Sequence, residues 1–452
     1  MRIRELFSAR DMTEGAPWKR IAEFAIPMIL GNLAQQLYNT VDSIVVGQYV
    51  GDHALAAVGT SMPILNLLLA LFVGVATGAG IVISQHFGAG DREALSRAIG
   101  NCITLAAIAS LATMIVGSLV TWPLLRLLGT PDSVIQWCAD YLMIFFLGSA
   151  GFTFYNILSG ILRGMGDSFS ALGFLLIATV LNIGLDIWFV AGFGMGVAGA
   201  AWATIIAQAL AAALALGVLL YRLSKMESDE DAHIFDIKIL KSIFKIALPS
   251  IIQQSVVSVG MLFVQVVVNR FGSSVVAGYT AATKIDSIAI VPMLGVGNAM
   301  STFTAQNIGA KQPERIKAGY RAALCMVGVM GVAIAVAMIG FGKQLVGMFM
   351  DSESSAAAIA AGAEYISVTA CFYLVFGFMN VTNGILRGSG AIMAFVLSSI
   401  GSLGIRVAVA FGFANMLSEM AVWISAPIGW VAAFIFAFAY YKTGKWKEKS
   451  LI

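Results

Sequence analysis

Two segments of the chain, 224 residues apart, are nearly the same. Residues 154–166 read FYNILSGILRGMG and residues 378–390 read FMNVTNGILRGSG, so eight of the thirteen positions are identical. Segments that recur in order at a nearly constant offset indicate an internal duplication. Two shorter motifs recur in the same order: AIP at 25–27 as ALP at 247–249, and QHFGA at 85–89 as QNIGA at 306–310.

The composition is that of a protein embedded in lipid. The chain has 452 residues, of which 59% are hydrophobic and only 11% charged, and its mean hydropathy is +0.88. Soluble domains carry about 25% charged residues, and a membrane-spanning helix needs roughly 20 mostly apolar residues. We therefore expect an all-α polytopic membrane protein with twelve transmembrane helices in two six-helix bundles related by duplication. Twelve stretches of at least 18 residues lack Asp, Glu, Lys and Arg: 24–41, 53–90, 98–125, 141–162, 168–185, 187–221, 246–269, 287–310, 322–342, 365–386, 388–405 and 420–441.

The distribution of basic residues predicts the orientation. With the N-terminus inside, the inner segments carry 22 of the 27 Lys and Arg residues and the outer loops only three. Because Lys and Arg accumulate on the cytoplasmic side, we expect a multi-pass protein of the plasma (inner) membrane with both termini in the cytoplasm. The expected organisation is an N-terminal six-helix lobe at 1–222, a cytoplasmic linker at 223–240 and a C-terminal six-helix lobe at 241–452. Two parallel repeats that enclose a central site suit alternating access.

Ionisable residues inside spans are costly and mark function by default. Asp42 lies late in the first span and Asp186 late in the fifth, with Asn182 one helical turn before Asp186 and Thr204 in the next span. Carboxylate, amide and hydroxyl oxygens suit a small hard cation, and two carboxylates can also share a proton. The sequence therefore predicts an ion-coupling site for Na⁺ or H⁺. A structural hydrogen bond from Asp42 to a neighbouring span is the alternative interpretation.

The duplication tests whether these residues belong to the scaffold. At the repeat offsets Asp42 corresponds to Val264, Asp186 to Ala410 and Asn182 to Arg406. The scaffold motifs are kept in both halves while the acids are not, so we expect the ion site in the N-terminal half only.

Other polar or helix-breaking residues also lie within the spans. Gln35 and Tyr38 share a helix face with Asp42, and a polar stripe in a span must face a cavity or another polar helix. Pro27 removes a helix hydrogen bond, which makes it either a hinge or a static bend. Lys284 either snorkels outward or faces the interior, and the roles of Asp286 and Arg406 stay open.

At this point the chain resembles the multidrug and toxic compound extrusion (MATE) family, from about residue 16 to residue 441. Together the matching pieces are specific, although each alone is weak. They are AIP at 25–27, the Asp42 segment ending in Val46-Gly47, QHFGA at 85–89, GILRGMGD at 160–167, NIGLD at 182–186 and GVAGAA at 196–201.

The resemblance implies a secondary antiporter that exports amphipathic, often cationic, compounds against inward Na⁺ or H⁺. It implies that Asp42, Asn182, Asp186 and Thr204 form the coupling-ion site. It also implies that Gln35, Tyr38 and Asn156 line the nearby substrate cavity. Some branches of the family carry acids on the first helix of the second half. Here that helix has Gln253, Gln254 and Gln265 instead, which leaves the coupling ion undecided.

Other functions fit the sequence less well. A flippase for lipid-linked precursors would need a cavity rich in Arg and Lys, whereas only Lys284 and Arg406 lie within spans. An enzyme is not expected, because the three histidines lie far apart and no metal, nucleophile or nucleotide-binding motif is present; a channel would need a ring of charges or a filter motif. We expect a monomer in the lipid bilayer with small-molecule substrates, no nucleic-acid partner, and no cofactor or metal apart from the transported Na⁺ or H⁺.

Overall fold

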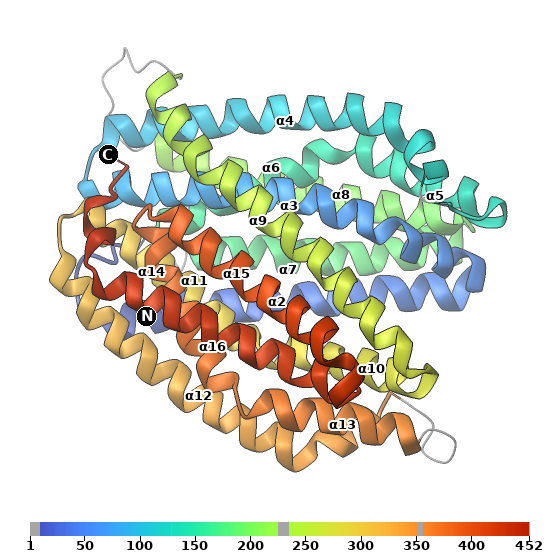
Figure 1. Ribbon diagram of the computed structural model, residues 1–452. Helices are drawn as coiled ribbons and strands as arrows, with labels where there is room; N and C mark the ends of the chain where they lie inside the picture. Colours follow the sequence, from blue (N-terminus) through green and yellow to red (C-terminus); the bar gives the residue numbers. More distant parts are fainter. Residues whose placement is uncertain (1–9, 128, 225–234, 350–355, 452) are drawn as a thin grey trace. The chain divides into compact units, whose positions relative to one another are not determined.

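The computed structural model describes residues 10–127, 129–224, 235–349 and 356–451. Within these ranges the side chains at 39, 42, 43, 52, 53, 55 and 56 lie outside the description. The described chain is helical and holds no strand (Figure 1). In the first half the helices are α2 (Pro17–Tyr49), α3 (Asp52–Ala89), α4 (Arg92–Leu127), α5 (Asp132–Leu147), α6 (Ser149–Gly164), α7 (Ser168–Asp186), the π-helical turn η1 (Ile187–Gly192) and α8 (Gly196–Leu223). In the second half they are α9 (Ile237–Val268), the short η2 (Asn269–Phe271), α10 (Ser273–Ala289), α11 (Val291–Gly309), α12 (Pro313–Gly347), α13 (Ala356–Ala370), α14 (Tyr373–Gly388), α15 (Ile392–Leu417), α16 (Met420–Lys442) and the short η3 (Lys445–Glu448).

The predicted spans correspond to these helices one by one. In the part of the chain that the structure describes, eight helices are long and apolar enough to cross a bilayer, and three bent helix pairs each supply one more span. The remaining predicted span, 24–41, lies in α2. The expected fold class, an all-α membrane protein of two six-span halves, is confirmed.

Three spans are broken rather than straight. The α5–α6 pair bends by 53°, the α13–α14 pair by 52° and the α10–α11 pair by 41°. The first two breaks, at Gly148 and at Phe372, lie 224 residues apart and so occupy the same place in the two halves. The third follows from Pro292 in the first turn of α11, because proline has no N–H to continue the hydrogen bonding of α10.

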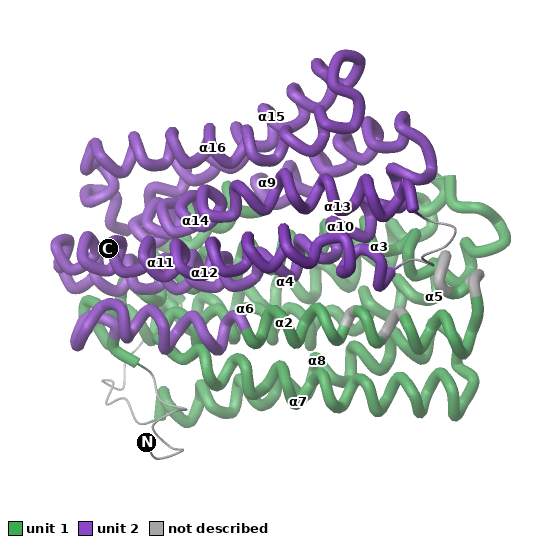
Figure 2. Tube along the Cα trace, turned by 90° about the horizontal axis from the view of Figure 1, so that it is seen from below, with its two compact units in different colours: residues 1–11, 30–251 green, residues 12–29, 252–452 purple. Residues whose placement is uncertain are grey.

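The chain forms two compact units. Unit 1 includes the start of α9, and unit 2 includes the start of α2. Unit 1 comprises residues 1–11 and 30–251, and unit 2 comprises residues 12–29 and 252–452 (Figure 2). Both α2 and α9 therefore pass from one unit to the other part-way along their length. The predicted boundary at 223–240 stays a prediction, since 225–234 lies outside the described residues.

A proline precedes each of these crossing points. Pro27 lies two residues before the division at Ile29, and Pro249 lies two residues before the division at Ile251. Each proline leaves one backbone carbonyl of its helix without the usual N–H partner. Each shared helix thus lacks one backbone hydrogen bond shortly before it passes from one unit to the other.

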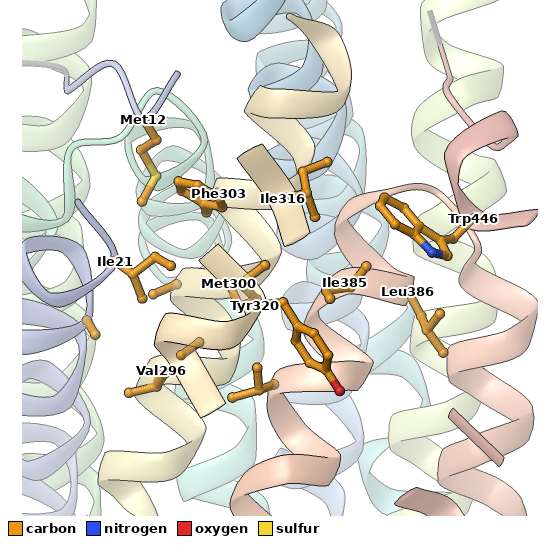
Figure 3. Packing of buried hydrophobic residues seen from close by; sticks show 14 of the residues in the cluster. Met12, Ile21, Val296, Met300, Phe303, Ile316, Tyr320, Ile385, Leu386 and Trp446 are labelled. Carbon is orange, nitrogen blue, oxygen red and sulfur yellow. The ribbon is translucent and has the colours of Figure 1, made fainter. Parts of the chain in front are cut away.

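The segment ahead of α2 is held firmly in unit 2. The backbone N–H of Met12 donates to Gln306 Oε1 at 2.9 Å, and the Met12 carbonyl accepts from Asn307 at 3.2 Å. Arg315 donates to the carbonyls of Met12 and Glu14 at 3.2 and 2.6 Å. The Met12 side chain is buried and points toward Phe303 in the core of this unit (Figure 3).

The residue ahead of α9 is held in the same manner in unit 1. Asn101 donates to the Asp236 carbonyl at 2.8 Å and accepts from the Asp236 N–H at 3.2 Å. Arg97 forms an ion pair with the Asp236 carboxylate.

Glycines bring α3 and α6 into backbone contact within unit 1. A Cβ atom on Gly160 would lie 2.7 Å from the carbonyl oxygen of Ala76, and one on Gly164 would lie 2.7 Å from that of Gly80. Small residues four apart allow this close approach in membrane helices, where van der Waals packing drives association.

The same contact recurs between α11 and α14 in unit 2. A Cβ atom on Gly384 would lie 2.4 Å from the Gly297 carbonyl oxygen, and one on Gly388 would lie 2.1 Å from that of Ser301. Arg387 reinforces this contact by donating to Asn298 Oδ1 at 2.6 Å. The repeated GILRG sequence is therefore the packing surface of one helix pair in each half.

Replacing Gly388 by alanine is expected to lower the melting temperature of the purified protein in detergent. The added methyl group would overlap the Ser301 carbonyl, and overpacking of this kind costs roughly 1–3 kcal/mol. Gly412→Ala in α15 is the matched control, because a Cβ atom there meets nothing within 4 Å; its melting temperature should not fall. Equal melting temperatures for the two variants would contradict the packing role of the repeat.

Candidate functional site

Three of the predicted ion-site residues lie together in unit 1. Asn182 and Asp186 occupy the last turns of α7, and Thr204 lies on the facing helix α8. Asn182 and Asp186 are fully buried and Thr204 is 5% exposed. Asn182 is the centre of the group, because its amide reaches both other side chains.

The Asn182 amide bridges Asp186 and Thr204. Its nitrogen donates to Asp186 Oδ2 at 3.0 Å, and its oxygen accepts from the Thr204 N–H at 3.2 Å. This orientation satisfies an ionised Asp186, since it gives the carboxylate a donor.

The group brings a carboxylate, an amide and a hydroxyl together in a buried place. Oxygen atoms of these kinds suit a small hard cation, and a buried carboxylate can also take up a proton. The geometry suits either coupling ion.

The Asp42 side chain lies outside the described residues, and only its place on α2 is known. The neighbouring Val45 belongs to a buried cluster that also contains Val190 and Ala200, and Val41 packs against that cluster. The stretch of α2 around Asp42 therefore shares a hydrophobic cluster with the segments that follow Asp186 and precede Thr204.

The repeat offers an independent view of the same positions. Val264 and Ala410, the counterparts of Asp42 and Asp186, are both fully buried and belong to one hydrophobic cluster in unit 2. The second half thus fills with apolar side chains the place where the first half carries acids.

The predicted substrate-cavity residues lie in the same unit as the Asn182–Asp186–Thr204 group. Gln35 and Tyr38 lie on the part of α2 that belongs to unit 1; Tyr38 is buried and Gln35 half-buried. Asn156 lies on α6 and donates to the Phe152 carbonyl of its own helix at 2.8 Å. The roles of these three residues stay predictions.

Unit 2 contains a separate polar group that sequence reasoning did not assemble. Tyr373 donates to Asp286 Oδ1 at 2.6 Å, and Arg406 lies 3.5 Å from the Tyr279 hydroxyl. Asp286 is 8% exposed, whereas Lys284 is exposed, so the two charges point to different sides of α10. Asp286 thus has a tyrosine partner from a helix 87 residues away, which no local pattern indicates.

Helices α9 and α15 also line an open apolar pocket within unit 2. Its volume is about 530 Å³, within the usual range of roughly 300–1,000 Å³ for sites that hold drug-sized molecules. Its lining includes Val259, Phe263, Leu403 and Val407, with Ser255 as a polar residue. The pocket therefore suits the apolar part of an amphipathic molecule.

Asn182→Leu is expected to destabilise the protein by roughly 1–3 kcal/mol, because buried Asp186 loses a hydrogen-bond donor. Thermal unfolding in detergent measures the change. Asn380→Leu in α14 is the control, since that amide donates to a carbonyl of its own helix, and it should give a smaller change. If the two variants unfold alike, the Asn182 amide does not support Asp186.

Comparison with protein-family models gives one match that covers most of the chain. The MatE model matches residues 27–188 and again residues 249–411. The two matches coincide with the two halves of the duplication.

Curated relatives and a solved structure extend over almost the entire length. The chain is 31% identical over 98% of its length to the probable multidrug resistance protein YpnP of Bacillus subtilis, of which the match covers 99%. It is 28% identical over 96% of its length to the probable multidrug resistance protein YoeA of the same organism, of which 95% is covered. The structure of a multidrug resistance MATE family transporter in its outward-facing conformation matches with a TM-score of 0.90 and 27% identity, over 98% of this chain and 99% of that one.

Proposed function

Because the chain belongs to the MatE family of multidrug efflux transporters, we propose that it is a secondary antiporter that exports amphipathic or cationic compounds in exchange for Na⁺ or H⁺. It works by alternating access, as a monomer in the inner membrane with both termini in the cytoplasm. The observation that carries this proposal is the buried Asn182–Asp186–Thr204 group.

The ion-coupling role rests on the chemistry of this group. A buried carboxylate beside an amide and a hydroxyl suits the reversible uptake of one small cation. Asp42 completes the site in this proposal. Val264 and Ala410, which correspond to Asp42 and Asp186 in the second half, belong to the same hydrophobic cluster. The movement of one charge through 100 mV releases about 2.3 kcal/mol, enough for more than tenfold accumulation of a neutral substrate.

Substrate binding in this proposal uses the polar groups of Gln35, Tyr38 and Asn156, which all lie in unit 1. Polar groups on membrane-spanning helices favour substrates that are themselves partly polar, such as amphipathic compounds.

A flippase for lipid-linked precursors is not favoured. Arg406 and Lys284 are the basic residues predicted within the spans; Arg406 lies beside tyrosines within unit 2, and Lys284 is exposed. Among the matching relatives, YpnP is named a probable multidrug resistance protein and MepA of Staphylococcus aureus a multidrug export protein, whereas one of Shewanella oneidensis is named an FAD transporter. The absence of enzymatic activity stays a prediction.

Asp42→Asn and Asp186→Asn are each expected to reduce gradient-driven export to below about one tenth of wild type, as losses of ion-site ligands commonly do. The measurement is uptake of a fluorescent cation into inverted vesicles under an imposed Na⁺ or H⁺ gradient. The gradient that drives uptake by the wild type identifies the coupling ion. Uptake by both variants at the wild-type rate would remove the proposed ion site.

Asp286→Asn is the matched control for these two variants. It also replaces a buried aspartate by its amide, but in unit 2, and it keeps an oxygen that accepts from Tyr373. It should retain coupling to the same gradient. If Asp286→Asn loses transport as completely as Asp186→Asn, the coupling site is not confined to the first half.

Pro27→Ala and Pro249→Ala are expected to slow transport severalfold while leaving substrate affinity unchanged. Alanine restores one hydrogen bond to each shared helix and stiffens it where it passes between units. Substrate affinity is measured in vesicles without a gradient and the transport rate with one. Pro427→Ala in α16, a helix that lies wholly in unit 2, is the control. If Pro27→Ala and Pro249→Ala both transport at the wild-type rate, the two prolines are static bends and not hinges.

A further inference from the structure

A glutamine one turn beyond Thr204 is buried without an evident structural role. Gln208 lies on α8 and is 3% exposed. Among the residues that the structure describes, no donor reaches its Oε1 atom. A buried carbonyl oxygen without a donor destabilises a fold by about 1–3 kcal/mol, so this side chain requires another explanation.

The position of Gln208 follows from that of the ion-site residues. Residues four apart share one face of a helix, so Gln208 points to the same side of α8 as Thr204, toward α7. Because Thr204 faces Asn182, Gln208 lies at the level of Ala178, about 6 Å farther along the helix axis. Ala178, Ala207 and Ala211 form a buried apolar cluster at this level.

Gln208 also lies between the ion-site group and the level of Asn156. Gly148 of the bent α5–α6 span packs on Ile205, and Gly151 of α6 packs on Ala209, so α6 and α8 run in the same direction with a constant offset. By this offset Asn156 lies about 8 Å beyond Gln208. Along the helix axes, the level of Asn182 and Thr204 is thus followed by that of Gln208 and then by that of Asn156, toward the Arg222 end of α8.

The second half shows that the fold does not need a glutamine here. Residues 200–204 read AAWAT and residues 421–425 read AVWIS, an offset of 221 that pairs Gln208 with Gly429. A Cβ atom on Gly429 would lie 2.7 Å from the carbonyl oxygen of Ser402, the counterpart of Ala178. In the second half, which has no acids at the positions of Asp42 and Asp186, α15 and α16 are in direct contact at this level. In the first half, the amide of Gln208 lies there instead.

We propose that Gln208 Oε1 is an oxygen ligand for the coupling cation, Na⁺ or a water-borne proton, on its path between the Asn182–Asp186 pair and the Asn156 level. This inference rests on the proposed antiport function and adds a second binding position for the coupling cation next to the Asn182–Asp186 pair. A hard cation prefers amide oxygen as a ligand, and without a donor this oxygen is available for it.

The test compares Gln208→Leu with wild type in the same vesicle assay, under both a Na⁺ and an H⁺ gradient. We expect export to fall roughly tenfold and the concentration of driving ion that gives half-maximal export to rise roughly tenfold. Binding of the fluorescent cation without a gradient should stay unchanged. Gln208→Glu, which keeps an oxygen at this position, should retain export.

Stability separates this role from a structural one. Leucine relieves an unsatisfied oxygen, so Gln208→Leu should melt at or above the wild-type temperature. Gln253→Leu is the matched control: Gln253 is also buried, but it donates to Ser399 at 2.8 Å, so its loss should lower the melting temperature.

Two results would overturn the inference while leaving the antiporter intact. One is wild-type export and ion dependence in Gln208→Leu. The other is a melting temperature that falls together with export and is not restored in Gln208→Glu, which would make Gln208 a packing residue. If neither gradient drives export by the wild type, the proposed antiport function is wrong, and so is the proposed role of Gln208 as an ion ligand.

Discussion

Backbone contact through glycine is the constraint on which both halves of this protein depend. In lipid, apolar side chains gain little by leaving one apolar environment for another, so helices associate through close packing. Gly160 and Gly164 in α6, and Gly384 and Gly388 in α14, allow a neighbouring helix to approach to the distance of its carbonyl oxygens. The sequence repeat is best kept at these positions because any side chain there would separate the two helices.

The two halves share this scaffold but differ in their polar chemistry. The first half carries the Asn182–Asp186–Thr204 group and buries Gln208, whereas the second half has apolar residues, a serine or a glycine at three of these four places. Its own charges within the spans, buried Asp286 and half-buried Arg406, contact tyrosines instead. In a duplicated scaffold whose ion-site residues lie in one copy only, that half can bind the ion. The other half can stay apolar enough to bind organic molecules.

Sequence patterns were sufficient for the helices and for part of the site. Charge-free stretches located the spans because charge is costly in lipid, and the spacing of Asn182 and Asp186 on one helix placed them on one face. Contacts between distant helices had no such pattern: the Tyr373–Asp286 hydrogen bond and the docking of Met12 on Gln306 depend on tertiary packing alone. Gln208 was overlooked because a single amide in an apolar run gives no periodic signal.

The docking of Met12 also bears on how the protein is made. Its partner Gln306 lies 294 residues later in the chain, and at about 5–20 residues per second a ribosome needs roughly 15 to 60 seconds to reach it. The first helix is therefore inserted long before the surface that holds its beginning exists. A gene cut at the linker would produce two polypeptides that each carry part of the other's unit. Such fragments could complete their folds only by assembling as an interlocked pair.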